Sequence, residues 1–88
     1  MKHLSEDQIK KIFGLKLKQS RTEKDLSLLG LSKLTGLSKS YLNEIEKGKK
    51  YPKQDKVIAL AEALETSYEE LVSVKLKGNM ASLGEIVK

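Results

Sequence analysis

Apolar residues recur at helical spacing along most of this chain, and the pattern predicts helices separated by short polar connectors. The predicted helices cover about residues 5–21, 27–35, 38–47, 55–65 and 67–71. Near the C-terminus Val72, Val74 and Leu76 alternate at the period of a strand, but no segment predicts a clear strand. The pattern therefore predicts a small all-α domain with five helices.

The first helix has a start signal in addition to its apolar stripe. Ser5 is a candidate N-cap, and Gln8 three residues later completes a capping box. Four lysines are expected to fall mostly on the polar side of this helix, opposite the apolar stripe: Lys10, Lys11, Lys16 and Lys18. A polar connector is expected to follow from Thr22.

Two short helices are predicted to meet across a tight turn. Ser27 and Ser38 are suited to cap their N-termini, since a serine hydroxyl accepts from the free N–H groups of the first turn. Gly36 and Gly48 follow the two helices, and glycine readily takes the left-handed conformation that ends a helix. Helix, tight turn and helix are thus expected between residues 27 and 47.

Charge and composition narrow the function classes. The chain of 88 residues carries 17 Lys and Arg against 12 Asp and Glu, a net charge of +5 that suits an anionic partner or simply favours solubility. It has one histidine and no cysteine, so no catalytic set or thiolate metal site is expected. No apolar run approaches the roughly 18 residues of a membrane span, and the N-terminus lacks the apolar stretch of a signal peptide. We expect a cytoplasmic protein without enzymatic activity, metal or cofactor.

Three consecutive stretches carry a family resemblance. "FGLKLKQSR", "LSKLTGLSKSYLNEIEKGKKYP" and "VIALAEALETSYEEL" together resemble the phage-repressor and Cro-type (xenobiotic response element, XRE) family of helix-turn-helix DNA-binding domains. The resemblance implies a compact, five-helix, lambda-repressor-like fold over residues 5–72, with the helix-turn-helix motif at about 27–47. In such a motif one helix lies in the major groove and the preceding helix braces it.

The outward side of the helix over 38–47 supplies the candidates for reading bases. A helical step of 100° per residue places Tyr41, Leu42 and Ile45 on its inner side. Four outward residues have side chains that suit base edges: Lys39 for guanine, Asn43 for adenine, Ser40 for either, and Glu44 for a cytosine amino group. Glu44 could instead repel a misplaced phosphate, or simply be solvated, as any polar outer face can be.

The candidates for phosphate contact surround the end of this helix and its start. They are Ser38, Lys47, Lys49 and Lys50. Cations beside Gly48 can lie along the DNA backbone and release its counterions, although the same lysines could serve solubility alone. Gly36 is the residue assigned to the turn.

The resemblance also implies a structural ion pair, because a glutamate matching Glu46 pairs in the family with an arginine matching Arg21. One residue departs from the family pattern. Leu28 stands where a phosphate-contacting glutamine is usual, and with Leu29 it either closes over the first helix or meets a partner.

The sequence therefore predicts a regulator of transcription that binds double-stranded DNA sequence-specifically, acting as a repressor and as a homodimer. The alternative is an antitoxin-like or other protein-interaction module of the same fold, in which DNA binding is secondary. Residues 73–88 are predicted to be a dimerisation arm or the start of a further domain that contacts a partner.

Overall fold

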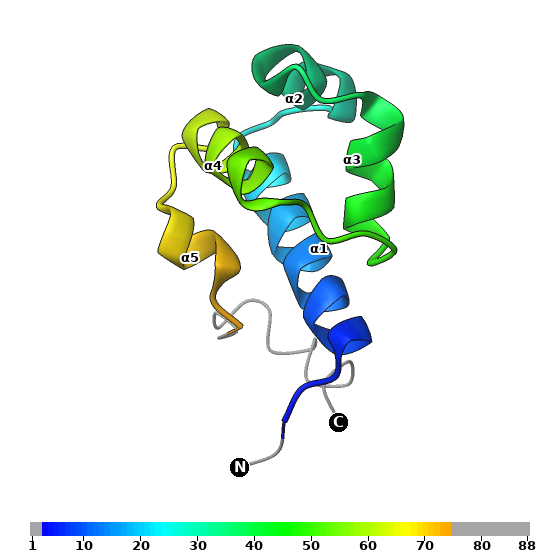
Figure 1. The fold of residues 1–88 in the computed structure, drawn as a ribbon. Helices are drawn as coiled ribbons and strands as arrows, with labels where there is room; N and C mark the ends of the chain where they lie inside the picture. The colour runs from blue at the N-terminus through cyan, green and yellow to red at the C-terminus, as the bar shows by residue number, and fades with distance from the viewer. Residues whose placement is uncertain (1–2, 75–88) are drawn as a thin grey trace.

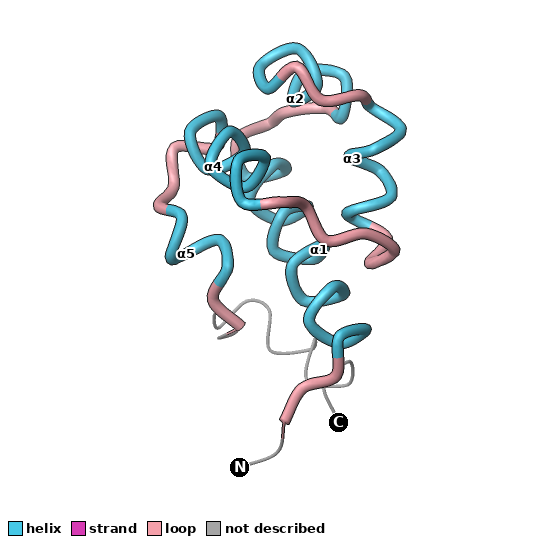
Figure 2. The backbone as a smooth tube through the Cα atoms, in the orientation of Figure 1, coloured by secondary structure: helices cyan, strands magenta, loops and turns pink. Residues whose placement is uncertain are grey.

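Residues 3–74 are described in a computed structural model, and they form five helices joined by short loops (Figure 1). The helices are α1 (Glu6–Glu23), α2 (Leu28–Thr35), α3 (Lys39–Glu46), α4 (Gln54–Ala63) and α5 (Tyr68–Val72). Within this part of the chain Figure 2 shows helices and loops and no strand. The all-α prediction is confirmed.

Serine caps fix where four of the helices begin. Ser5 and Gln8 form the expected capping box, with the Ser5 N–H donating to Gln8 Oε1 at 2.8 Å and the Gln8 N–H donating to Ser5 Oγ at 3.1 Å. Ser27, Ser38 and Ser67 cap α2, α3 and α5 in the same way, each accepting from the backbone N–H three residues later. Each contact joins residues three apart, which is why the sequence predicts the caps at Ser5, Ser27 and Ser38.

The end of α1 differs from the prediction. The helix continues to Glu23 rather than stopping near Arg21, so Thr22 and the following residue belong to it. Asp25 then takes the left-handed conformation, with φ of 57°. Asp tolerates this conformation better than most residues, so the chain turns without the glycine that usually signals a helix end.

One apolar core joins all five helices. α1 packs against α3 on one side and α5 on the other, while α2 contacts both α3 and α4. The buried cluster comprises Phe13, Leu17, Leu31, Leu42, Ile45, Val57, Leu60, Ala61, Leu64 and Leu71. Because Leu31, Leu42 and Ile45 belong to this core, α2 and α3 are held to α1 and α4 as one unit.

Lys16 does not lie on the polar side of α1, contrary to the prediction. It is only 4% exposed. Its ammonium donates to the backbone carbonyl oxygens of Glu70 and Ser73, both at 2.7 Å. These carbonyls lie at the C-terminal end of α5, where a helix leaves acceptors without intrahelical partners and favours a cation. Lys16 therefore ties α1 to the end of α5.

Replacing Lys16 by methionine is expected to loosen α5 specifically. Methionine keeps the apolar stem but removes the ammonium, so the two carbonyls lose charge-assisted donors at a net cost of about 1.5–3 kcal/mol. Hydrogen exchange should show faster exchange of the Ser73 amide, which donates to Glu69 O. Lys18→Met, at an exposed lysine of the same helix, should leave this amide unchanged. Equal protection in both variants would contradict the role of Lys16.

The C-terminal segment is predicted to be an arm or the start of a further domain. The prediction for 73–88 falls largely on residues 75–88, which lie outside the described part; Ser73 is the C-cap of α5. Among residues 3–74 no helix has both the length and the apolar character to cross a membrane.

Candidate nucleic-acid interface

Gly36 makes the turn between α2 and α3. It has φ of 79°, and a Cβ at this position would meet nothing within 4 Å, so glycine is favoured by backbone conformation rather than by space. Side chains on either side hold the turn. The Ser32 hydroxyl donates to Leu37 O at 2.6 Å, and Thr35 Oγ1 accepts from the Leu37 N–H at 3.2 Å. The angle between the two helices is thus fixed by local contacts.

α3 separates its inner and outer residues as the sequence predicts. Leu42 and Ile45 are fully buried. Ser38, Lys39 and Ser40 are exposed at its N-terminal end. The Ser38 hydroxyl accepts from the Tyr41 N–H at 3.0 Å, and its own O–H can still donate to a ligand.

Asn43 lies one turn further along α3 and is half-buried. Within residues 3–74 its side-chain amide makes no hydrogen bond, although both its carbonyl oxygen and its NH₂ group can form them. An amide held on a helix with its donor and acceptor unused can pair with N6 and N7 on the major-groove edge of an adenine.

The loop after α3 folds back onto the helix. Gly48 has φ of 77°, and backbone N–H groups of Lys47 and Lys49 donate to Asn43 O and Glu44 O, each at 3.0 Å. Lys47, Lys49 and Lys50 are all exposed. Three cations therefore lie in fixed backbone positions directly beyond the C-terminal end of α3.

Glu44 and Lys50 form an ion pair across this loop. Glu44 Oε1 lies 3.0 Å from Lys50 Nζ, and the same ammonium lies 5.7 Å from the centroid of the Tyr41 ring. Burial raises the pKa of the Tyr41 hydroxyl, and the nearby Lys50 ammonium offsets part of this effect. Glu44 thus has a partner within the protein, which the sequence did not indicate.

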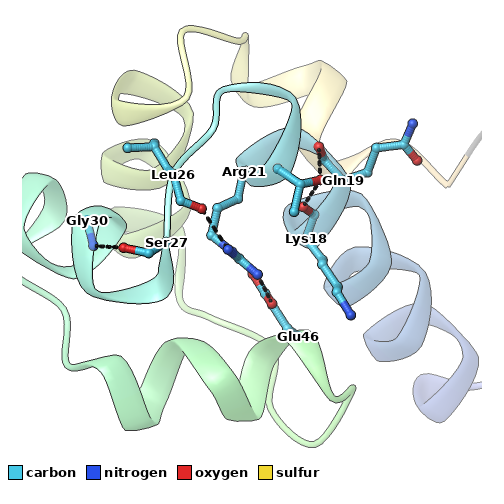
Figure 3. Close-up of polar contacts among 8 residues, drawn as sticks. Lys18, Gln19, Arg21, Leu26, Ser27, Gly30 and Glu46 are labelled. Atoms are coloured by element: carbon cyan, nitrogen blue, oxygen red, sulfur yellow. Dashed lines mark hydrogen bonds and ion pairs between the residues drawn. The ribbon is translucent and has the colours of Figure 1, made fainter.

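Arg21 joins three segments of the domain (Figure 3). Its Nε donates to Glu46 Oε2 at 2.7 Å, its Nη2 donates to Glu46 Oε1 at 3.0 Å, and its Nη1 donates to Leu26 O at 2.7 Å. The side chains of Arg21 and Glu46 are only 11% and 6% exposed. The hydrogen bonds to Glu46 raise the pKa of the Arg21 guanidinium above its ordinary value. This arrangement connects α1, the loop before α2 and the C-terminal end of α3.

Gly14 is a residue whose role the sequence did not reveal. A Cβ built on it would lie 2.3 Å from Ile45 O and 2.8 Å from Glu46 O, both backbone atoms of α3. Its lack of a side chain lets α1 and α3 approach this closely. A glycine inside a helix can have this function, but only the packing of α3 distinguishes it from a merely tolerated glycine.

Exposed Lys11 lies beside the loop after α3, since a Cβ on Gly48 would lie 2.8 Å from Lys11 Cγ. It adds a cation to the three lysines of the loop, and no local sequence signal could place it there.

Leu28 packs partly against the core, whereas Leu29 is 51% exposed.

The described residues contain no group of three or more His, Cys, Asp or Glu side chains positioned to hold a metal ion. What gathers around α3 is instead a set of hydrogen-bonding side chains followed by lysines. Such a surface can bind an anionic polymer that offers donors and acceptors.

Comparison with known proteins gives one family and several similar structures. The family model described as HTH_3, helix-turn-helix, matches residues 17–71. An HTH_3 family transcriptional regulator from Vibrio cholerae superposes with a TM-score of 0.72 at 31% identity, covering 76% of this chain. The restriction-modification controller protein C.AhdI from Aeromonas hydrophila superposes with a TM-score of 0.68 at 35% identity, over 70% of this chain and 94% of its own.

A third structure, the clp gene regulator ClgR from Corynebacterium glutamicum, has a TM-score of 0.74 at 25% identity, covering 88% of this chain and 81% of its own. The chain spans only 38% of the length of the Vibrio cholerae regulator. No curated protein sequence matches the chain.

Proposed function

The chain belongs to the HTH_3 helix-turn-helix family, and from this premise we propose that it is a cytoplasmic, sequence-specific, double-stranded-DNA-binding regulator of transcription. The observation that supports this proposal is the exposed, hydrogen-bonding first turn of α3, held at a fixed angle by the Gly36 turn and followed by a cluster of lysines. The similar proteins named as regulators of transcription support the same proposal. A helix of this kind fits the major groove, where each base pair has a distinct pattern of donors and acceptors.

Lys39, Ser40 and Asn43 are the residues that we assign to base edges. The first two are exposed at the N-terminal end of α3, the end that a recognition helix turns toward the bases. The Asn43 amide is the most specific of the three, since an amide bonded to both adenine positions discriminates against every other base.

Ser38, Lys47 and Lys49 are assigned to phosphates, but not Lys50, which is paired with Glu44. Their contacts would set the position of the domain on the duplex without selecting a sequence. Lys11 is a further candidate, because it lies beside Gly48 in the same basic region.

Asn43→Ala and Lys49→Ala are expected to separate the effect of a base contact from the effect of a phosphate contact. Loss of a bidentate base contact by Asn43→Ala should weaken the specific complex by roughly 1–3 kcal/mol and relax the preference at one base pair. Lys49→Ala should weaken binding to all sequences alike and flatten the dependence of log K on log salt by about 1. Fluorescence anisotropy on specific and random duplexes measures both effects. If each variant loses the same affinity on both duplexes, the division of roles is wrong.

Selection of bound sequences from a random duplex pool tests the proposal as a whole. A DNA-reading domain should enrich one motif. We expect a pseudo-palindrome with half-sites about one helical turn, roughly 34 Å, apart, because we propose that the chain acts as a two-fold homodimer. We propose repression as the direction of regulation, because a protein bound within a promoter can exclude other proteins from it.

Absence of an enriched motif would favour the second candidate, a protein-interaction module. The observation on its side is the exposure of two apolar residues on α2, Leu29 at 51% and Leu34 at 60%. Residues 73–88 are the other proposed contact region, either as a dimerisation arm or as the start of a further domain. An interaction module would tolerate loss of the outward charges of α3, whereas a DNA-binding domain would not.

A further inference from the structure

Lys50 differs from the other two lysines of the loop after α3. Its ammonium lies 3.0 Å from the Glu44 carboxylate and over the ring of Tyr41. Among the described residues, Lys47 and Lys49 make no ion pair. The three lysines are close in sequence but differ in their surroundings, because Lys50 is the one that lies beside a carboxylate among the described residues.

We propose that Glu44 withholds Lys50 from the DNA phosphates and thereby lowers the affinity of the domain for DNA of random sequence. The inference rests on the proposed function, since it concerns how the same surface meets DNA. It assigns Glu44 to the control of specificity and not to a base edge.

Two features keep the pair together on the surface. The loop backbone is fixed to the same helical turn, because the Lys49 N–H donates to Glu44 O at 3.0 Å. The Tyr41 ring supports the ammonium from a second direction, as a cation–π contact. An isolated exposed ion pair has little strength, but here the backbone already places both partners within reach of each other.

A phosphate that approached Lys50 would also approach Glu44. The attraction to the ammonium and the repulsion from the carboxylate would act over similar distances and largely cancel. Lys50 then releases no counterion on binding, and counterion release is what drives binding to DNA of random sequence. When a protein binds random DNA less tightly, sites of random sequence compete less with its specific site. The Glu44 carboxylate therefore raises specificity at the cost of affinity.

The test is a mutant cycle on the salt dependence of binding. The full chain and the variants Glu44→Gln, Lys50→Met and the double variant are titrated by anisotropy with a random-sequence duplex over a range of NaCl concentrations. Glu44→Gln should free one cation, tighten binding about threefold to tenfold at low salt and steepen the slope by about 0.9. Lys50→Met should leave the slope unchanged when Glu44 is present, although the unpaired carboxylate should weaken binding, and should flatten the slope by about 0.9 in the Glu44→Gln background.

Lys49→Met is the matched control, since this neighbouring lysine makes no ion pair among residues 3–74. It should flatten the slope by about 0.9 in both backgrounds, which shows that the DNA-binding surface is working. If Lys50→Met flattens the slope equally with and without Glu44, Lys50 already contacts phosphate and the inference is overturned although the proposed function stands. If no protein binds duplex DNA, the proposed function fails and the inference fails with it.

Discussion

Arg21→Ala is expected to lower the free energy of unfolding by about 3 kcal/mol, because it leaves the Glu46 carboxylate shielded from water without its partner. The value lies at the lower end of the range for buried pairs, since 11% of the Arg21 side chain still meets water. The substitution also removes the donor to Leu26 O. For a domain of this size the loss corresponds to a fall in melting temperature of more than about 10 °C, measured by circular dichroism.

Two further variants show whether the buried charge is the cause. Lys24→Ala breaks the exposed pair between Lys24 and Glu65, whose side chains are 39% and 76% exposed, and should leave the melting temperature nearly unchanged. The double variant Arg21→Met/Glu46→Leu removes both charges and should recover part of the lost stability. If Arg21→Ala has the same melting temperature as the wild type, the ion pair between Arg21 and Glu46 does not stabilise the fold.

Gly14→Ala is the second variant with a large expected effect. Alanine normally stabilises a helix interior relative to glycine by about 1 kcal/mol. Here the new Cβ would lie 2.3 Å from Ile45 O and 2.8 Å from Glu46 O, and backbone atoms of a packed helix cannot move aside without shifting α3. Overpacking of this kind costs about 3 kcal/mol, so the clash exceeds the gain in helix propensity. Chemical denaturation should show a net loss of about 2 kcal/mol.

Gly30→Ala is the matched control, because it places the same substitution within α2. Its Cβ would lie 3.3 Å from Ser27 Oγ and 3.4 Å from Leu26 Cδ2, which are side-chain atoms. The stability of this variant should stay within about 1 kcal/mol of the wild type. Equal stabilities of the two variants would show that α1 and α3 do not depend on the close approach at Gly14.

Both large effects concern the same structural property, the position of α3 on α1. Arg21 holds the C-terminal end of α3, and Gly14 permits the contact at Ile45 and Glu46. A shift of α3 would displace Lys39, Ser40 and Asn43, the residues that we propose to contact bases, so we expect residual folded protein of either variant to bind DNA less specifically. The packing of the core and the geometry of reading are therefore linked through one helix interface.

The sequence alone determined the features that depend on neighbouring residues. The serine caps and the glycine at the helix-turn-helix junction act within three or four positions, and amphipathic periodicity identifies Leu42 and Ile45 as core residues of α3. The order of these elements was enough to indicate the family. The ion pair between Arg21 and Glu46 is implied by the family resemblance, and no local pattern predicts it.

The contacts that join distant segments depend on how the helices pack, so the sequence does not reveal them. Lys16 is three residues after Phe13 and four after Ile12, so its spacing already places it on the apolar side of α1, but only the end of α5, 54 residues away at Glu70, provides the acceptors for its buried ammonium. Gly14 is an ordinary helical glycine until α3 lies against it, and Glu44 is an outward carboxylate until the loop brings Lys50 to it. Periodicity gives the direction of a side chain from its own helix axis, but the neighbour that it meets depends on how the other helices pack.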